Sequence, residues 1–144
     1  MSHEQRLPGA ARALLYGAMA LGALAAASAI AAQPGAGPLP IPPGVALKSW
    51  QANGSDGRYV LQVIQGRAPK SGKQIIATVT SDTDCDADAQ GLSHCHNNLK
   101  LANGTQITVI DSHNMHQFRC LGEGDQLTLK AVGTSWTVAT LTKK

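Results

Sequence analysis

HCHNNLKLANGTQITVIDSH, residues 94–113, is the stretch that decides the fold prediction. Two segments with alternating apolar residues flank an Asn-Gly dipeptide, which is typical of a β-hairpin turn. Because side chains on a strand alternate between two faces, the length of the turn decides which residues share a face. A two-residue turn pairs Ala102 with Thr105 and leaves apolar side chains on both faces. A three-residue turn with Gly104 in the left-handed region pairs Leu101 with Thr105 instead.

The three-residue turn sorts the hairpin into one apolar and one polar face. We predict this register, because burying a coherent apolar face outweighs a small difference in turn preference. The face expected to point inward carries Leu99, Leu101, Ile107 and Val109, together with Cys95, Asp111 and His113. The opposite face carries His94, His96, Lys100 and Gln106.

The remainder of the chain after residue 43 repeats this pattern of short β-branched segments separated by Gly- and Asn-containing turns. Seven strands are predicted, at 45–51, 58–65, 73–80, 95–101, 105–113, 126–132 and 135–142. We therefore expect an all-β fold, a small antiparallel barrel of OB-like type or a sandwich, formed by one domain over 44–144. The two tryptophans, Trp50 and Trp136, are expected in its core.

The N-terminal third is expected to lie outside this domain. Arg6 and Arg12 precede an uncharged Ala/Leu-rich run that closes on small residues, so residues 1–32 are predicted to be a signal peptide. The alternative is an uncleaved membrane anchor. Residues 33–43 are rich in Pro and Gly and are predicted to form an extended tether. A periplasmic or secreted location follows.

Soft metal ligands are concentrated in one part of the chain. Between residues 85 and 120 lie Cys85, His94, Cys95, His96, His113, Met115, His116 and Cys120. Three successive antiparallel strands would bring this segment to one rim of the barrel. Thiolate, thioether and imidazole groups together suit Cu(I), and Zn(II) tolerates such a set. We predict a copper-binding or copper-buffering site whose ligands are His113, Met115, Cys120, Cys95 and His116.

The three cysteines also permit a disulfide, which is common in exported proteins. Cys85 with Cys95 is the preferred pairing, because these residues end and begin successive strands, and Cys95 with Cys120 is the second choice. Such a bridge contributes about 3 kcal/mol to stability and leaves one thiol over. The alternative function is accordingly a disulfide-stabilised secreted module that binds a protein or envelope component, with no metal role.

Other functions are disfavoured by the sequence. The formal charge of +3 is spread without a basic run, which argues against nucleic acid as a partner. Cys120 and His116 form no recognisable catalytic motif, so no enzymatic activity is expected. The alternating carboxylates at 82–88 resemble the start of a calcium loop, but Ala87 and Ser93 stand where Gly and Glu are required, so calcium is not expected. Contact with a membrane is expected only through an uncleaved signal peptide.

Overall fold

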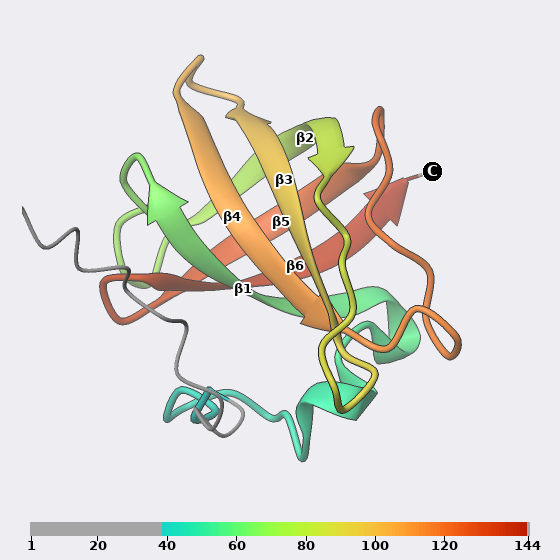
Figure 1. The fold of residues 1–144 in the computed structure, drawn as a ribbon. Helices are drawn as coiled ribbons and strands as arrows, with labels where there is room; N and C mark the ends of the chain where they lie inside the picture. Colours follow the sequence, from blue (N-terminus) through green and yellow to red (C-terminus); the bar gives the residue numbers. More distant parts are fainter. Residues whose placement is uncertain (1–38, 144) are drawn as a thin grey trace, which may run out of the picture. The chain divides into compact units, whose positions relative to one another are not determined.

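The structure, a computed structural model, describes residues 39–143. The predicted signal peptide and the tether up to residue 38 lie outside the described residues. Six strands form a closed barrel in the order β1-β4-β3-β2-β5-β6 (Figure 1). Their bounds are β1 Arg58–Gln65, β2 Gln74–Thr83, β3 Ser93–Leu101, β4 Gln106–His113, β5 Gln126–Val132 and β6 Trp136–Lys143. Two short 3-10 turns, η1 Trp50–Ala52 and η2 Ser55–Gly57, precede β1.

All six strand pairs are antiparallel, so the predicted small antiparallel barrel is confirmed. The barrel has six strands, whereas an OB barrel has about five. The prediction of a strand at 45–51 was wrong. This segment packs instead across the outer surface of β1 and β6, where Val45 and Leu47 contact the buried Trp50 and Val60. A closed barrel offers no free edge with which that segment could pair.

The register predicted for the central hairpin is confirmed. Leu99 pairs with Ile107, and Cys95 pairs with Asp111. The turn is closed by hydrogen bonds from the Leu101 amide to the Thr105 carbonyl and from the Gly104 amide to the Leu101 carbonyl, both 2.8 Å. Gly104 has a φ of 84°, the left-handed conformation that this turn requires.

The barrel interior is apolar near the hairpin turn and polar at the opposite end. Buried apolar side chains from all six strands fill the first half, among them Leu61, Val79, Leu99, Leu127 and Ala139. The inward positions where β3 begins and β4 ends carry Ser93, Cys95, Asn97, Asp111 and His113, all of them buried. Within residues 39–143, the ionisable groups buried on β3 and β4 thus lie at the end of the barrel away from the hairpin turn.

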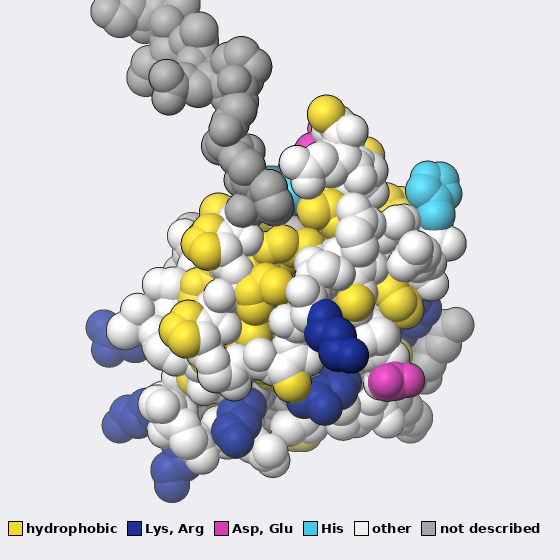
Figure 2. Space-filling view, turned by 90° about the horizontal axis from the view of Figure 1, so that it is seen from below, with side chains coloured by type: hydrophobic (Ala, Val, Ile, Leu, Met, Phe, Trp, Pro, Cys, Tyr) yellow, Lys and Arg dark blue, Asp and Glu magenta, His cyan; other side chains and the backbone are white. Residues whose placement is uncertain are grey.

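A second apolar cluster lies outside the barrel. Trp50 and Trp136 pack with ring centroids 5.7 Å apart, and Leu92 is buried in the same cluster. Figure 2, seen from the end that carries η1 and η2, shows hydrophobic side chains across the middle of this face and Lys and Arg side chains along one edge. The tryptophans thus attach the segment before β1 to the barrel rather than filling the barrel core.

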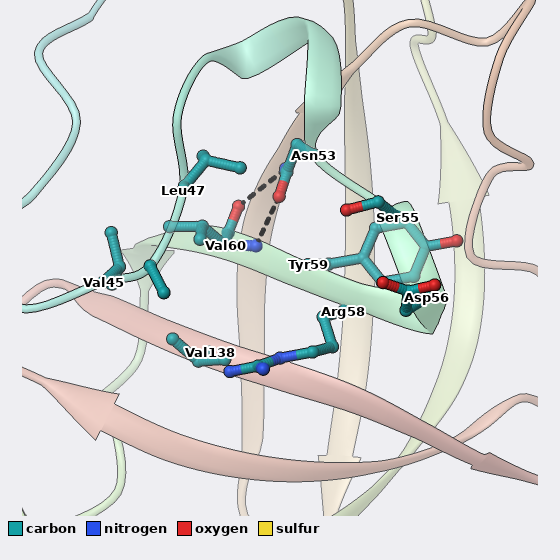
Figure 3. Close-up of a pocket in the computed structure, with 10 residues that line it drawn as sticks. Val45, Leu47, Asn53, Ser55, Asp56, Arg58, Tyr59, Val60 and Val138 are labelled. Atoms are coloured by element: carbon teal, nitrogen blue, oxygen red, sulfur yellow. Dashed lines mark hydrogen bonds between the residues drawn. The ribbon is translucent and has the colours of Figure 1, made fainter.

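Asn53 joins this segment to the polar end of the barrel. Its side-chain oxygen accepts a hydrogen bond from the Val60 amide at 2.7 Å, and its Nδ2 donates to the Val60 carbonyl at 3.1 Å (Figure 3). The same Nδ2 lies 2.9 Å from the Ser112 carbonyl and 3.3 Å from Asp111 Oδ1. Because Asn53 is fully buried, these bonds replace the water it loses on folding.

Within residues 39–143 there is no helix with the length and apolar character needed to cross a membrane.

Candidate functional site: a cysteine and aspartate cluster

Three sulfur atoms and one carboxylate meet at the polar end of the barrel. One ligand atom from each of Asp82, Cys85, Cys95 and Cys120 lies within 4.8 Å of those of the other three. We call these four residues the Cys/Asp cluster. Its members come from the end of β2, the loop after β2, the beginning of β3 and the loop after β4. Figure 1 shows both loops running close to the end of the barrel where β3 begins.

A β-bulge turns Asp82 toward the cluster. The pairing of β2 with β3 shifts by one residue between Val79 and Ser81, so Asp82 pairs with the inward-facing Asn97. Asn97 Nδ2 donates a hydrogen bond to Asp82 Oδ1 at 2.9 Å, which fixes the carboxylate beside the sulfur atoms. Without the extra residue of the bulge, alternation would point Asp82 outward.

Cys85 and Cys95 form a disulfide, which was the preferred pairing from the sequence. Cys95 is fully buried on β3, and Cys85 is half-buried in the loop that follows β2. Cys85 Sγ also lies 3.3 Å from Asp82 Oδ1. Disulfides of this kind are typical of proteins in oxidising compartments.

Cys120 is the free cysteine of the cluster, and its loop is held by two contacts. Its Sγ lies 4.0 Å from Cys95 Sγ. On one side, the buried Tyr59 hydroxyl donates to the Arg119 carbonyl at 2.9 Å. On the other side, the Arg119 guanidinium contacts Asp125 at 2.7 Å. The position of the thiol is therefore set by the barrel wall and not by the loop alone.

The electrostatic environment of the cluster is negative. Burial raises the pKa of the Cys120 thiol, and the charges of Asp82 and Asp111 raise it further. Burial also raises the pKa of Asp82, although its hydrogen bond from Asn97 and the nearby His113 act in the opposite direction. A cation placed among these groups would stabilise their ionised forms.

His113 points into the barrel and pairs with Asp111. The two side chains are fully buried, and His113 Nδ1 lies 3.2 Å from Asp111 Oδ2. The Tyr59 ring meets the imidazole edge-on at a centroid distance of 6.2 Å. Burial lowers the pKa of His113, but the adjacent Asp111 carboxylate outweighs it, so the pKa is raised overall. Burial raises the pKa of Asp111 as well.

The other predicted ligands lie outside the cluster. Met115 and His116 are exposed in the turn that follows β4, where the Asn114 side chain accepts a hydrogen bond from the His116 amide. His113 is near enough to Asp82 to affect its pKa but is not a member of the four-residue group. Of the five predicted ligands, the structure thus brings Cys95 and Cys120 together.

His94 and His96 make separate contacts with carboxylates on the outer surface. His94 lies between Ser112 Oγ at 2.8 Å and Asp88 Oδ2 at 3.1 Å. His96 Nδ1 is 4.0 Å from Asp84. A shallow pocket between residues 45–47 and β1 contains none of the sulfur or imidazole groups (Figure 3). The Cys/Asp cluster is accordingly the candidate site.

In the comparisons with known proteins, no protein-family model, curated protein or solved structure matches the chain.

The buried pair predicts how stability depends on pH. Because the pKa of His113 is raised by folding, its stabilising contribution is complete below about pH 6.5, the value for an unperturbed imidazole, and is lost as the pH rises through the folded-state pKa. Thermal unfolding of the full chain between pH 6 and 9 should show a falling melting temperature. His113→Gln should flatten this slope, whereas the exposed His116→Gln should preserve it. Equal slopes for the two variants would contradict the assignment.

Proposed function

We propose that this protein is an exported binder of a soft metal ion, Cu(I), which it holds through the Cys/Asp cluster in its reduced form. The observation that carries the proposal is the convergence of the Asp82 carboxylate and three sulfur atoms within 4.8 Å. Thiolates are the ligands that select Cu(I) and Zn(II) over harder ions. Two sulfur ligands of one ion, each bonded to it at about 2.3 Å, lie at a separation similar to the distances between these ligand atoms.

The surroundings of the cluster support a cationic ligand. Asp82 and Asp111 both act on the Cys120 thiol as negative charges, and a monovalent cation bound by thiolates reduces that repulsion. Metal binding deprotonates the thiols, so affinity should rise with pH. His113 acts on Asp82 as a nearby positive charge.

The disulfide makes binding dependent on redox state. In the oxidised form, the Cys85–Cys95 bond withdraws two of the three sulfur ligands. Reduction returns them, and the proximity of Asp82 and Cys120 to this disulfide supports a shared site for all four groups. We therefore expect high affinity in the reduced protein and release of the metal when the disulfide forms.

A competition titration tests this function. The full chain, reduced with a phosphine, is titrated with Cu(I) against a chromophoric Cu(I) chelator. Cys120→Ser should weaken binding by roughly 100-fold or more, since even changes beyond the direct ligands cost about 10–100-fold in metal affinity. The exposed variants Met115→Leu and His116→Ala serve as matched controls and should bind as the parent chain does. Equal affinities for Cys120→Ser and the parent chain would refute the site.

The identity of the metal is tested at Asp82. A carboxylate oxygen is a common ligand of Zn(II) but contributes little to a site that selects Cu(I) through sulfur. Asp82→Asn keeps the shape of the side chain and should leave the Cu(I) affinity nearly unchanged. A loss of Cu(I) affinity as large as that of Cys120→Ser would make Asp82 an essential ligand and contradict a site that selects Cu(I) through sulfur.

The disulfide itself favours a second candidate function, a disulfide-stabilised secreted module that binds a protein or envelope component. In that case, the Cys85–Cys95 bond serves stability alone, and the reduced chain binds Cu(I) no better than the oxidised chain. The same titration, carried out in both redox states, separates the two functions.

A further inference from the structure

The three cysteines of the cluster are arranged so that the free thiol can reach the disulfide. Cys120 Sγ lies 4.0 Å from Cys95 Sγ, which is bonded to Cys85. Reacting atoms are typically about 3–3.5 Å apart in a productive ground state, so a movement of less than about 1 Å closes the gap. The third sulfur, Cys85 Sγ, lies beside Asp82 Oδ1.

We propose that the oxidised protein carries out an internal thiol–disulfide exchange in which Cys120 displaces Cys85 from Cys95. This activity needs no metal and stands independently of the copper function. It also gives a role to Cys120, the cysteine that is not part of the Cys85–Cys95 disulfide.

The chain and solvent water supply every atom and electron that the exchange requires. Cys120 loses its proton to water, and the thiolate forms a bond to Cys95 Sγ as the Cys85–Cys95 bond breaks. The bonding electron pair leaves on Cys85 Sγ, which takes up a proton. One disulfide and one thiol are present before and after, so no oxidant or reductant is consumed.

The two isomers differ in which loop carries the thiol. Before exchange it belongs to the loop after β4, whose position is set by Tyr59 and Arg119. After exchange it belongs to the loop after β2, where the Cys85 thiol can donate a hydrogen bond to Asp82, whose Oδ1 lies 3.3 Å from Cys85 Sγ while the Cys85–Cys95 bond is intact. Cys95 remains bonded in both isomers, which fits its complete burial on β3.

Peptide mapping distinguishes the isomers directly. Trypsin cleavage sites place Cys85 and Cys95 on one peptide, 74–100, and Cys120 on another, 120–130. The oxidised full chain is incubated without metal at pH 8 with a maleimide, quenched with acid and digested. Exchange predicts peptides 74–100 and 120–130 joined through Cys95 and Cys120, with the maleimide on Cys85. Labelling confined to Cys120, with the disulfide retained inside 74–100, would overturn the proposal.

Two variants test whether the joined peptides arise from attack of Cys120 on the disulfide. Cys120→Ser retains the Cys85–Cys95 disulfide and should lose both the joined peptides and all labelling. Cys85→Ser, oxidised mildly, should form the Cys95–Cys120 bond in a folded chain, and failure to do so would also overturn the proposal. The rate of exchange in the parent chain should be independent of protein concentration, and a rate that rises with concentration would assign the exchange to collisions between molecules.

Discussion

Replacing Asp111 with alanine is expected to lower the free energy of unfolding by about 3–5 kcal/mol, the usual cost of removing one partner of a buried ion pair. Asp111 is fully buried, and its Oδ2 lies 3.2 Å from His113 Nδ1. Its Oδ1 accepts a hydrogen bond from Asn53 Nδ2 at 3.3 Å. Its loss leaves the imidazole without its counter-charge and part of the Asn53 amide without an acceptor. Urea unfolding of the full chain at pH 6.5 measures the change.

The matched control for this variant is Asp84→Ala. Asp84 is exposed and lies 4.0 Å from His96, and exposed ion pairs of this kind contribute little to stability. We expect its unfolding midpoint to remain close to that of the parent chain. Similar losses in Asp84→Ala and Asp111→Ala would show that the Asp111–His113 pair does not support the polar end of the barrel.

The second large effect is expected in the apolar half of the barrel. Leu99 is fully buried on β3 and pairs with Ile107, so Leu99→Ala should cost about 2–5 kcal/mol through lost burial and a residual cavity. The neighbouring Lys100 is exposed on the outer face, and Lys100→Ala should change stability by less than about 0.5 kcal/mol. A loss at Lys100 larger than that at Leu99 would contradict the register.

The parts of the fold that depend on neighbouring residues could be predicted from the sequence. The turn at Gly104 and the inward face from Cys95 to Val109 follow from the period-two pattern and one turn rule. The Cys85–Cys95 pairing follows from the same local reasoning, because the two residues flank a single connection between successive strands.

Features that depend on distant contacts could not be predicted in this way. Nothing in the local pattern marks the bulge between Val79 and Ser81, so the sequence groups Asp82 with the alternating carboxylates at 82–88 and not with the cysteines. Alternation also could not distinguish a strand at 45–51 from an extended segment packed on the outside of a closed barrel. Trp50 and Trp136 meet only because β6 lies beside β1.

The structure brings the predicted ligands Cys95 and Cys120 together and leaves Met115 in the turn after β4. Period-two alternation places Met115 on the same face as His113 if the strand continues, but β4 ends at His113. The Asn114 carbonyl then accepts hydrogen bonds from the Gln117 and Phe118 amides, which turns the chain away from the barrel. Met115 is 44% exposed as a result.

X-ray absorption at the copper edge tests the convergence of sulfur atoms in the Cys/Asp cluster most directly. The reduced full chain, loaded with one equivalent of Cu(I), should show a first coordination shell dominated by sulfur. Cys120→Ser should remove one sulfur neighbour from that shell. A shell of nitrogen and oxygen alone, or one that is identical in the parent chain and in Cys120→Ser, would contradict the account.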